Sequence, residues 1–164
     1  MGKREKVLVS ACLLGEKVRY DGSDCQQRGL IEQWQREGRV VPLCPEVAGE
    51  LPVPRPPAEI EDGNAEAVLQ GKSAIRRKDG TDVSESFLQG AEKALAECWK
   101  HKIKIAVLKE GSPSCGANRV NDGTFSGIKI NGQGLTARLL ARHGISVFSE
   151  AQMDEAAKRL TELE

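Results

Sequence analysis

The sequence predicts an α/β protein in which a largely parallel sheet has helices on both faces and carries a small β insertion. Short apolar segments typical of buried strands alternate with longer segments of helical periodicity. No internal repeat is present, and no linker divides the chain into two domains. A length of 164 residues suits one hydrophobic core. We therefore expect a single domain over residues 1–164.

The first two elements that we expect are a buried strand and a helix. Residues 6–11 (KVLVSA) are mostly apolar, which is typical of a strand that is covered on both faces. Residues 24–37 are expected to be helical, because Leu30 and Trp34 lie on one face and Gly38 can end the helix.

A second short strand and a stiff loop follow. Residues 39–43 are apolar, and Pro42 indicates an edge position because proline cannot donate a ladder hydrogen bond. Residues 45–57 are rich in proline, which predicts a stiff, irregular loop of functional importance. Residues 58–80 contain Asp-Gly turn dipeptides and are expected to form the small strands of a β insertion.

The clearest helix is predicted at residues 83–101, with Asp82 as its N-cap. The buried stripe that its periodicity predicts consists of Phe87, Leu88, Ala91, Ala94, Leu95, Cys98 and Trp99. A third strand at residues 102–108 should lead into a loop at residues 109–118.

The rest of the chain predicts a hairpin and three further elements. Asp122-Gly123 is typical of a hairpin turn. Helical periodicity predicts helices at residues 135–143 and 152–163, and an apolar run predicts a strand at residues 145–148 between them. This alternation completes the pattern of a parallel α/β sheet, in which ligands bind beyond the carboxyl ends of the strands.

Composition argues against several classes of protein. The 24 basic and 24 acidic side chains give no excess of positive charge for binding nucleic acid. No apolar run reaches the roughly 18–20 residues of a membrane-spanning helix. The N-terminus imitates an export signal, but the apolar stretch before Cys12 is shorter than the about 7–15 residues that such a signal needs. We therefore expect a cytoplasmic protein whose five cysteines are reduced.

Three of the cysteines occupy equivalent positions after predicted strands. Cys12 follows the first strand, Cys44 the second, and Cys115 lies in the loop after the third. Because parallel strands end at the same edge of a sheet, these three residues could meet at one site. Cys98 lies on the apolar stripe of a helix and is expected to be a core residue. Cys25, at the start of the first predicted helix, has no such placement after a strand.

The pattern of cysteines indicates an open metal or cluster site. The chain lacks the C-x-x-C and H-x-x-x-H spacings typical of zinc ribbons and fingers. Soft thiolate ligands favour zinc, cuprous copper or iron–sulfur clusters. An iron–sulfur cluster held by three cysteines would leave one iron free for a substrate.

Polar residues next to the cysteines suggest an enzyme. Glu46 stands in the motif C-P-E, where its carboxylate could transfer protons, although a solvated side chain would look the same. Ser112 and Ser114 belong to the motif S-P-S-C-G. They could supply hydroxyl groups to the site, or they could be ordinary turn residues. His101 and His143 are both placed at predicted helix ends, so neither is favoured as the base of a Cys–His pair.

Several short motifs, spread over nearly the whole chain, form a distinctive combination. The motifs are V-S-A-C-L-L-G at 9–15, R-Y-D-G at 19–22, P-L-C-P-E-V-A-G at 42–49, L-P-V-P-R-P-P-A-E at 51–59, S-P-S-C-G at 112–116, D-G-T-F-S-G at 122–127, G-L-T-A at 134–137 and H-G-I-S-V-F-S-E at 143–150. With this combination the chain resembles a bacterial family, long catalogued as a domain of unknown function, that includes the iron–sulfur-dependent thiouracil desulfidases.

The resemblance implies a [4Fe-4S] cluster bound by Cys12, Cys44 and Cys115, with the sulfur of a thiocarbonyl substrate on the fourth iron. By motif position, Glu46 and Ser112 correspond to the residues that assist catalysis in that family. The expected partner is a small thiolated nucleobase such as thiouracil, which would give uracil and hydrosulfide without net redox change. Two alternatives are an iron–sulfur carrier of sulfur in nucleotide or tRNA thiolation and a non-catalytic, zinc-stabilised binding domain.

Overall fold

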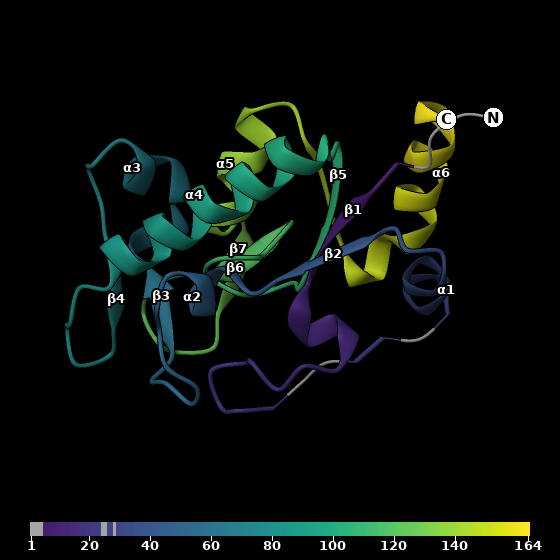
Figure 1. The fold of residues 1–164 in the computed structure, drawn as a ribbon. Helices are drawn as coiled ribbons and strands as arrows, with labels where there is room; N and C mark the ends of the chain where they lie inside the picture. The colour runs from purple at the N-terminus through teal and green to yellow at the C-terminus, as the bar shows by residue number, and fades with distance from the viewer. Residues whose placement is uncertain (1–4, 24–25, 28) are drawn as a thin grey trace.

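The computed structural model describes residues 5–23, 26–27 and 29–164. Its centre is a parallel sheet of four strands in the order β2-β1-β5-β8 (Figure 1). The strands are β1 (Val7–Ser10), β2 (Val40–Leu43), β5 (Ile105–Leu108) and β8 (Ser146–Ser149). The predicted α/β fold class is confirmed. Because β2 and β5 lie on opposite sides of β1, the strand order reverses between β1 and β5, and such a switch point is where ligands bind in these sheets.

The apolar runs form the strands because both faces of the sheet are covered. All four residues of β1 and of β5 are buried, as their mostly apolar sequences predict, and Ser10 of β1 is the one polar residue among them. The prediction that Pro42 marks an edge is also confirmed, since β2 is an outer strand and Pro42 pairs with Val9 on its one partnered side.

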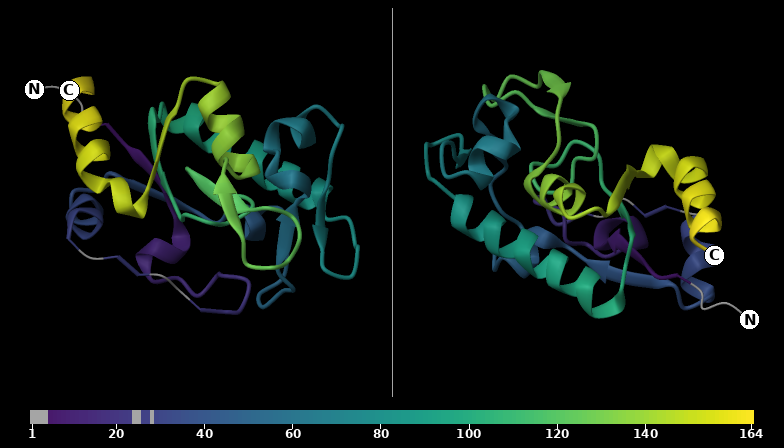
Figure 2. Two further views of the ribbon diagram at one scale, coloured as in Figure 1. Left: turned by 180° about the vertical axis from the view of Figure 1, so that it is seen from behind. Right: turned by 90° about the horizontal axis from the view of Figure 1, so that it is seen from above.

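The helices cover the two faces in pairs (Figure 2). The helices are α1 (Leu30–Arg36), α4 (Ser84–His101), α5 (Leu135–Arg142) and α6 (Met153–Leu163). Alternate residues of β1 face opposite ways: Leu8 packs with α4 and α5, whereas Val7 and Val9 pack with α1 and α6. No helix in the described part of the chain is long and apolar enough to cross a lipid bilayer.

Two α-helices and two strands lie between β2 and α4 in the chain. They are α2 (Pro45–Ala48), β3 (Ala58–Ile60), α3 (Ala65–Leu69) and β4 (Ile75–Arg77). All of them except α2 contribute to a third hydrophobic cluster with the first half of α4. β3 and β4 pair antiparallel, and β6 (Arg119–Asn121) and β7 (Lys129–Asn131) form the predicted hairpin. The expectations for this region were wrong in two respects, because the proline-rich stretch begins with helix α2 and the β insertion contains helix α3.

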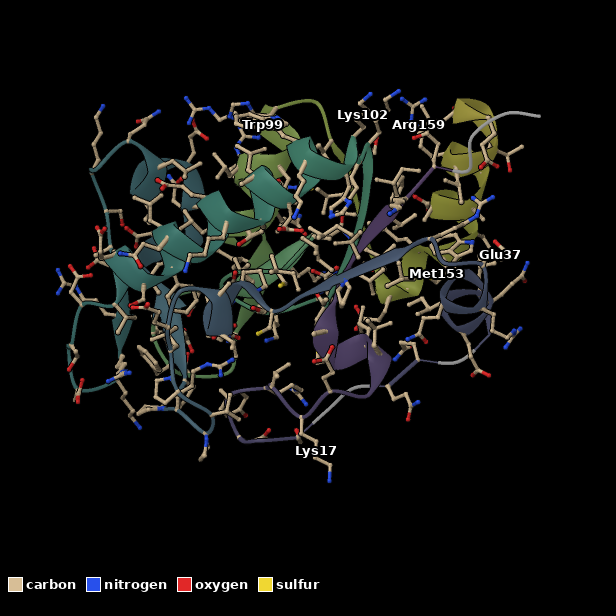
Figure 3. The ribbon with its side chains drawn as sticks, viewed as in Figure 1. Lys17, Glu37, Trp99, Lys102, Met153 and Arg159 are labelled. Carbon is tan, nitrogen blue, oxygen red and sulfur yellow. The ribbon has the colours of Figure 1, made fainter. Side chains whose placement is uncertain are left out.

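Two further expectations differ from the structure. The first helix begins at Leu30 rather than at residue 24, because Gly29 has a positive φ of 82° that no α-helix accommodates. Asp24 and Cys25 lie outside the described residues. Trp99, labelled in Figure 3, is 63% exposed and packs edge-on against the ring of His143, because it lies one helical step beyond the buried face.

Candidate active site

The structure brings Cys12, Cys44 and Cys115 to one cavity of about 490 Å³ at the carboxyl edge of the sheet. Cys12 lies in a 3-10 helix (Ala11–Leu14) that follows β1 directly. Cys44 follows β2 and is the N-cap of α2, and Cys115 lies in the loop after β5. The convergence arises because three parallel strands end at the same edge. A cavity of this size accommodates a small cofactor and a small-molecule ligand.

The thiols around the cavity are shielded from solvent. Cys12 and Cys115 are buried and Cys44 is partly buried. Burial raises the pKa of Cys44, and it raises the pKa of Cys115 well above its ordinary value although the hydroxyl of Ser10 acts in the opposite direction. Thiolates rather than thiols bind metals, so a cationic group in the cavity would offset the cost of ionising these side chains.

The remaining cysteines do not contribute to this cavity as far as the structure describes them. Cys98 lies on the buried face of α4, and burial raises the pKa of its thiol to about 12. Its placement agrees with the expected core role, whereas Cys25 lies outside the described residues. Among the described residues, no group of three or more His, Cys, Asp or Glu side chains surrounds a point closely enough to hold a single metal ion.

The loop after β5 holds Ser112 in a defined orientation. The Ser112 Oγ accepts hydrogen bonds from the backbone N–H groups of Ser114 and Cys115, at 3.0 and 3.1 Å. With both accepting positions used, its own proton is directed to Glu46 Oε2, 3.2 Å away. Ser114 faces away from the cavity and hydrogen-bonds the hydroxyl of Thr136 at 2.8 Å in the interior. Ser112 is therefore the serine with access to the cavity.

Glu46 comes to the cavity on α2, whose position depends on a close contact with α4. A Cβ atom on Gly90 would lie 1.9 Å from the carbonyl oxygen of Pro45, so only glycine permits this approach. Lys93 of α4 also donates a hydrogen bond to the carbonyl of Ala48, at 2.7 Å. These contacts place the Glu46 carboxylate opposite the loop that carries Ser112.

Arg55 is a site residue that sequence reasoning did not identify. Its guanidinium is buried in the wall of the cavity, and its Nε donates to Glu46 Oε1 at 3.1 Å. The only available signal was that it is the single charged residue in the stretch L-P-V-P-R-P-P. Arginine in so apolar a stretch needs a partner when it is buried.

Glu110 fixes the loop that carries Ser112 and Cys115. Its carboxylate accepts hydrogen bonds from the backbone N–H groups of Gly111, Asn118 and Arg119 and from the side-chain amide of Asn118. Burial alone would raise the pKa of Glu110, but these donors together lower it. The two ends of the loop are thereby joined, which restricts the positions of the residues between them.

Further side chains at the cavity were also not predicted. Tyr20 provides an exposed aromatic surface, and Arg19, Arg119 and Lys129 add positive charge. Lys109 lies at the wall as well and forms an ion pair of 3.0 Å with Glu150. The aromatic ring and the few polar groups give the cavity the mixed lining that is typical of small-molecule sites.

Together, the fold and the cavity define a class of protein: an α/β enzyme with three cysteines and a carboxylate–hydroxyl pair around one small-molecule cavity. A family model described as 2-thiouracil desulfurase matches residues 7–152. The chain belongs to this family, and the resemblance inferred from the motifs is confirmed.

Two similar proteins support this assignment. The uncharacterized protein YbbK of Bacillus subtilis (strain 168) is 42% identical over 149 residues, which cover 91% of this chain and 98% of YbbK. Among solved structures, the [4Fe-4S]-dependent thiouracil desulfidase TudS superimposes with a TM-score of 0.88 at 46% identity. The superposition covers 96% of this chain and 98% of TudS, so the similarity includes the cavity and the sheet alike.

Proposed function

We propose that this protein is a non-redox desulfidase that removes sulfur from a small thiolated nucleobase such as 2- or 4-thiouracil. In this proposal Cys12, Cys44 and Cys115 hold a [4Fe-4S] cluster, and the products are uracil and hydrosulfide. The observation that carries the proposal is that these cysteines share one cavity with the Glu46–Ser112 pair. Membership of the 2-thiouracil desulfurase family and the similarity to TudS support the same reaction.

The residues at the cavity fit a cluster with three protein ligands. The three thiols come from three different strand ends, and no other cysteine among the described residues lines the cavity. Soft thiolates are the ligands that iron–sulfur clusters use. When bound, such a cluster supplies an iron without a protein ligand, which can polarise the sulfur of a C=S bond as a Lewis acid.

Glu46 is proposed to move the protons of the reaction. Water adds its oxygen to the thiocarbonyl carbon, the C–S bond breaks with its electron pair on sulfur, and no oxidant or reductant is required. One proton of that water leaves with the sulfur as hydrosulfide. The Glu46 carboxylate lies at the cavity wall as a hydrogen-bond acceptor, so it can take the other proton and pass it to a ring nitrogen of a substrate bound in its thiolate form. Ser112 is proposed to orient the carboxylate and the reacting water through its fixed hydroxyl.

The decisive experiment combines cluster formation with sulfide release. We expect anaerobic reconstitution with iron and sulfide to give a brown protein that releases sulfide from thiouracil. Glu46→Gln and Ser112→Ala should keep the visible absorption of the cluster and lose turnover. Replacing Cys12, Cys44 or Cys115 by serine should remove the absorption, whereas Cys98→Ser serves as the control that keeps it.

Three results would contradict the proposal. A colourless protein that binds zinc in place of iron would favour a zinc-stabilised binding domain. A brown protein that releases no sulfide from free thiolated bases would favour a sulfur carrier. Full turnover in both Glu46→Gln and Ser112→Ala would remove the assigned roles.

A further inference from the structure

Arg55 is a buried cation with hydrogen-bonding partners in three segments of the chain. Its side chain is only 3% exposed. Nε donates to Glu46 Oε1 at 3.1 Å, Nη1 to the carbonyl of Pro52 at 3.1 Å, and Nη2 to the carbonyl of Val18 at 3.0 Å. A buried charge destabilises a protein unless it is paired and hydrogen-bonded, and the carboxylate and two carbonyls meet this requirement.

We infer that Arg55 is a positioning residue of the reaction, which holds the Glu46 carboxylate in place against Ser112; this inference rests on the proposed function. The two oxygens of Glu46 have separate partners: Oε1 accepts from Arg55 and Oε2 accepts from Ser112. The carboxylate therefore cannot rotate about its last bond without losing both hydrogen bonds. Such fixed orientation is what a group that transfers protons needs.

Arg55 also fixes one side of the cavity, through both its guanidinium and its backbone N–H. The Val18 carbonyl that accepts from Arg55 lies 3.9 Å from the Sγ of Cys44. The backbone N–H of Arg55 donates to the carbonyl of Tyr20 at 2.6 Å. Because Val18 and Tyr20 both line the cavity, Arg55 joins the catalytic carboxylate to the wall against which a substrate would lie.

The geometry requires arginine rather than any cation. Three donors on one rigid plane reach a carboxylate and two carbonyls that belong to different segments. A lysine ammonium keeps the charge but is a compact group on a flexible stem, and it cannot reproduce this fork. We therefore expect Arg55→Lys to be impaired although the charge is retained.

The test uses cluster-loaded protein and compares Arg55→Lys and Arg55→Ala with the wild type. A misplaced catalytic group reduces turnover by about a hundredfold for a displacement near 1 Å, so a loss of this order in kcat/KM is expected for both variants. Visible absorption should be retained. Added ethylguanidinium, far below concentrations that unfold proteins, should partly restore kcat of Arg55→Ala by occupying the vacated site.

Arg39 provides the matched control because it is a second buried arginine with a structural role. Its side chain is 9% exposed and pairs with Glu37 and Glu164, each at 2.9 Å. These partners lie at the end of the molecule near α1 and α6, where Figure 3 labels Glu37, away from the cavity. Arg39→Ala should lose stability but keep kcat, and ethylguanidinium should leave its kcat unchanged.

A readout that does not depend on turnover completes the test. Hydrogen exchange in the peptide covering residues 16–23 should be faster in Arg55→Ala than in Arg39→Ala, because the carbonyl of Val18 loses its guanidinium donor and only the backbone hydrogen bond to Tyr20 remains. Wild-type kcat/KM in Arg55→Lys would overturn the inference. Loss of the cluster in Arg55→Ala would also overturn it. So would an Arg55→Ala variant that is inactive, is not rescued by ethylguanidinium and shows the same hydrogen exchange as Arg39→Ala. If the wild type releases no sulfide, or if Glu46→Gln is fully active, the proposed function has failed instead.

Discussion

Helix propensity and the contact between α2 and α4 predict opposite effects of the substitution Gly90→Ala on stability. Alanine in the interior of an exposed helix is more favourable than glycine by about 1 kcal/mol. At Gly90, however, a Cβ atom would lie 1.9 Å from the carbonyl oxygen of Pro45, far inside the shortest contacts that Cβ atoms make. Separation beyond 3.0 Å requires α2 to move by more than about 1 Å, and such overpacking costs about 1–3 kcal/mol. We expect a net loss of up to about 2 kcal/mol in the free energy of unfolding.

The larger effect should fall on turnover. Glu46 follows Pro45 directly, so a displaced α2 breaks the 3.2 Å hydrogen bond to Ser112. We expect turnover to fall by about a hundredfold, as for other misplaced groups. Urea unfolding measures the stability, sulfide release measures the turnover, and visible absorption confirms that the cluster is present in each sample.

Ala96→Gly is the control for helix propensity. Ala96 is exposed on the same helix, so its replacement should lower stability by about 1 kcal/mol and leave turnover unchanged. A Gly90→Ala variant that is about 1 kcal/mol more stable than the wild type and fully active would show that the position of α2 does not depend on the close contact between Pro45 and Gly90.

Other features of the structure give three further predictions. Ser112→Ala leaves two backbone N–H groups without their acceptor and should lower the free energy of unfolding, measured by urea denaturation, by about 2–4 kcal/mol. Ser112→Thr keeps the hydroxyl and should retain most of the wild-type stability. Equal stability of all three proteins would contradict the hydrogen bonding. Because the folded pKa of Glu110 is depressed, its ionised form stabilises the fold above the ordinary glutamate pKa of about 4.3, and this stabilisation is lost as the pH falls through the lower folded value. Glu110→Gln should therefore be less stable than the wild type at pH 7 and show no deficit at strongly acidic pH; a deficit that does not change with pH would refute this reasoning. Since the Cys98 thiol is buried with a pKa of about 12, mass spectrometry should find it unalkylated by iodoacetamide at pH 8 in the native protein and alkylated in urea.

The parallel sheet and the cysteine cavity could be predicted from the sequence because short apolar runs indicate which strands are buried. The runs at β1 and β5 are apolar on both faces, and in a parallel sheet such strands must end at a common edge. The prediction that Cys12, Cys44 and Cys115 could meet at one site rests on this rule and on their positions after strands. Glu46 and Ser112 were identified by their closeness in sequence to the cysteines and by the resemblance to the desulfidase family, and neither observation predicts the hydrogen bond between them.

The parts that were missed depend on contacts between distant segments. Arg55 reaches Val18, which lies far earlier in the chain, and no periodicity in a proline-rich stretch reports such a contact. Helix α3 has five residues, too few for a helical period to be recognised. Trp99 lies beside the buried face of α4, where a one-step error in assigning the apolar stripe changes burial to 63% exposure.

The two halves of the site consequently have different structural origins, and this has a mechanistic consequence. The cysteines depend on the sheet, whose strand ends cannot shift without disturbing the core. The Glu46 carboxylate depends on α2 and Arg55, which belong to the segment between β2 and β3. Cys44 begins this segment but follows β2 directly, so substitutions further along the segment should alter turnover more than they alter the positions of the thiols. A double-mutant cycle with Arg55→Lys and Ser112→Ala can measure this separation. Because both residues act through Glu46, their effects on turnover should be strongly non-additive, whereas Arg39→Lys should leave the effect of Ser112→Ala on turnover unchanged.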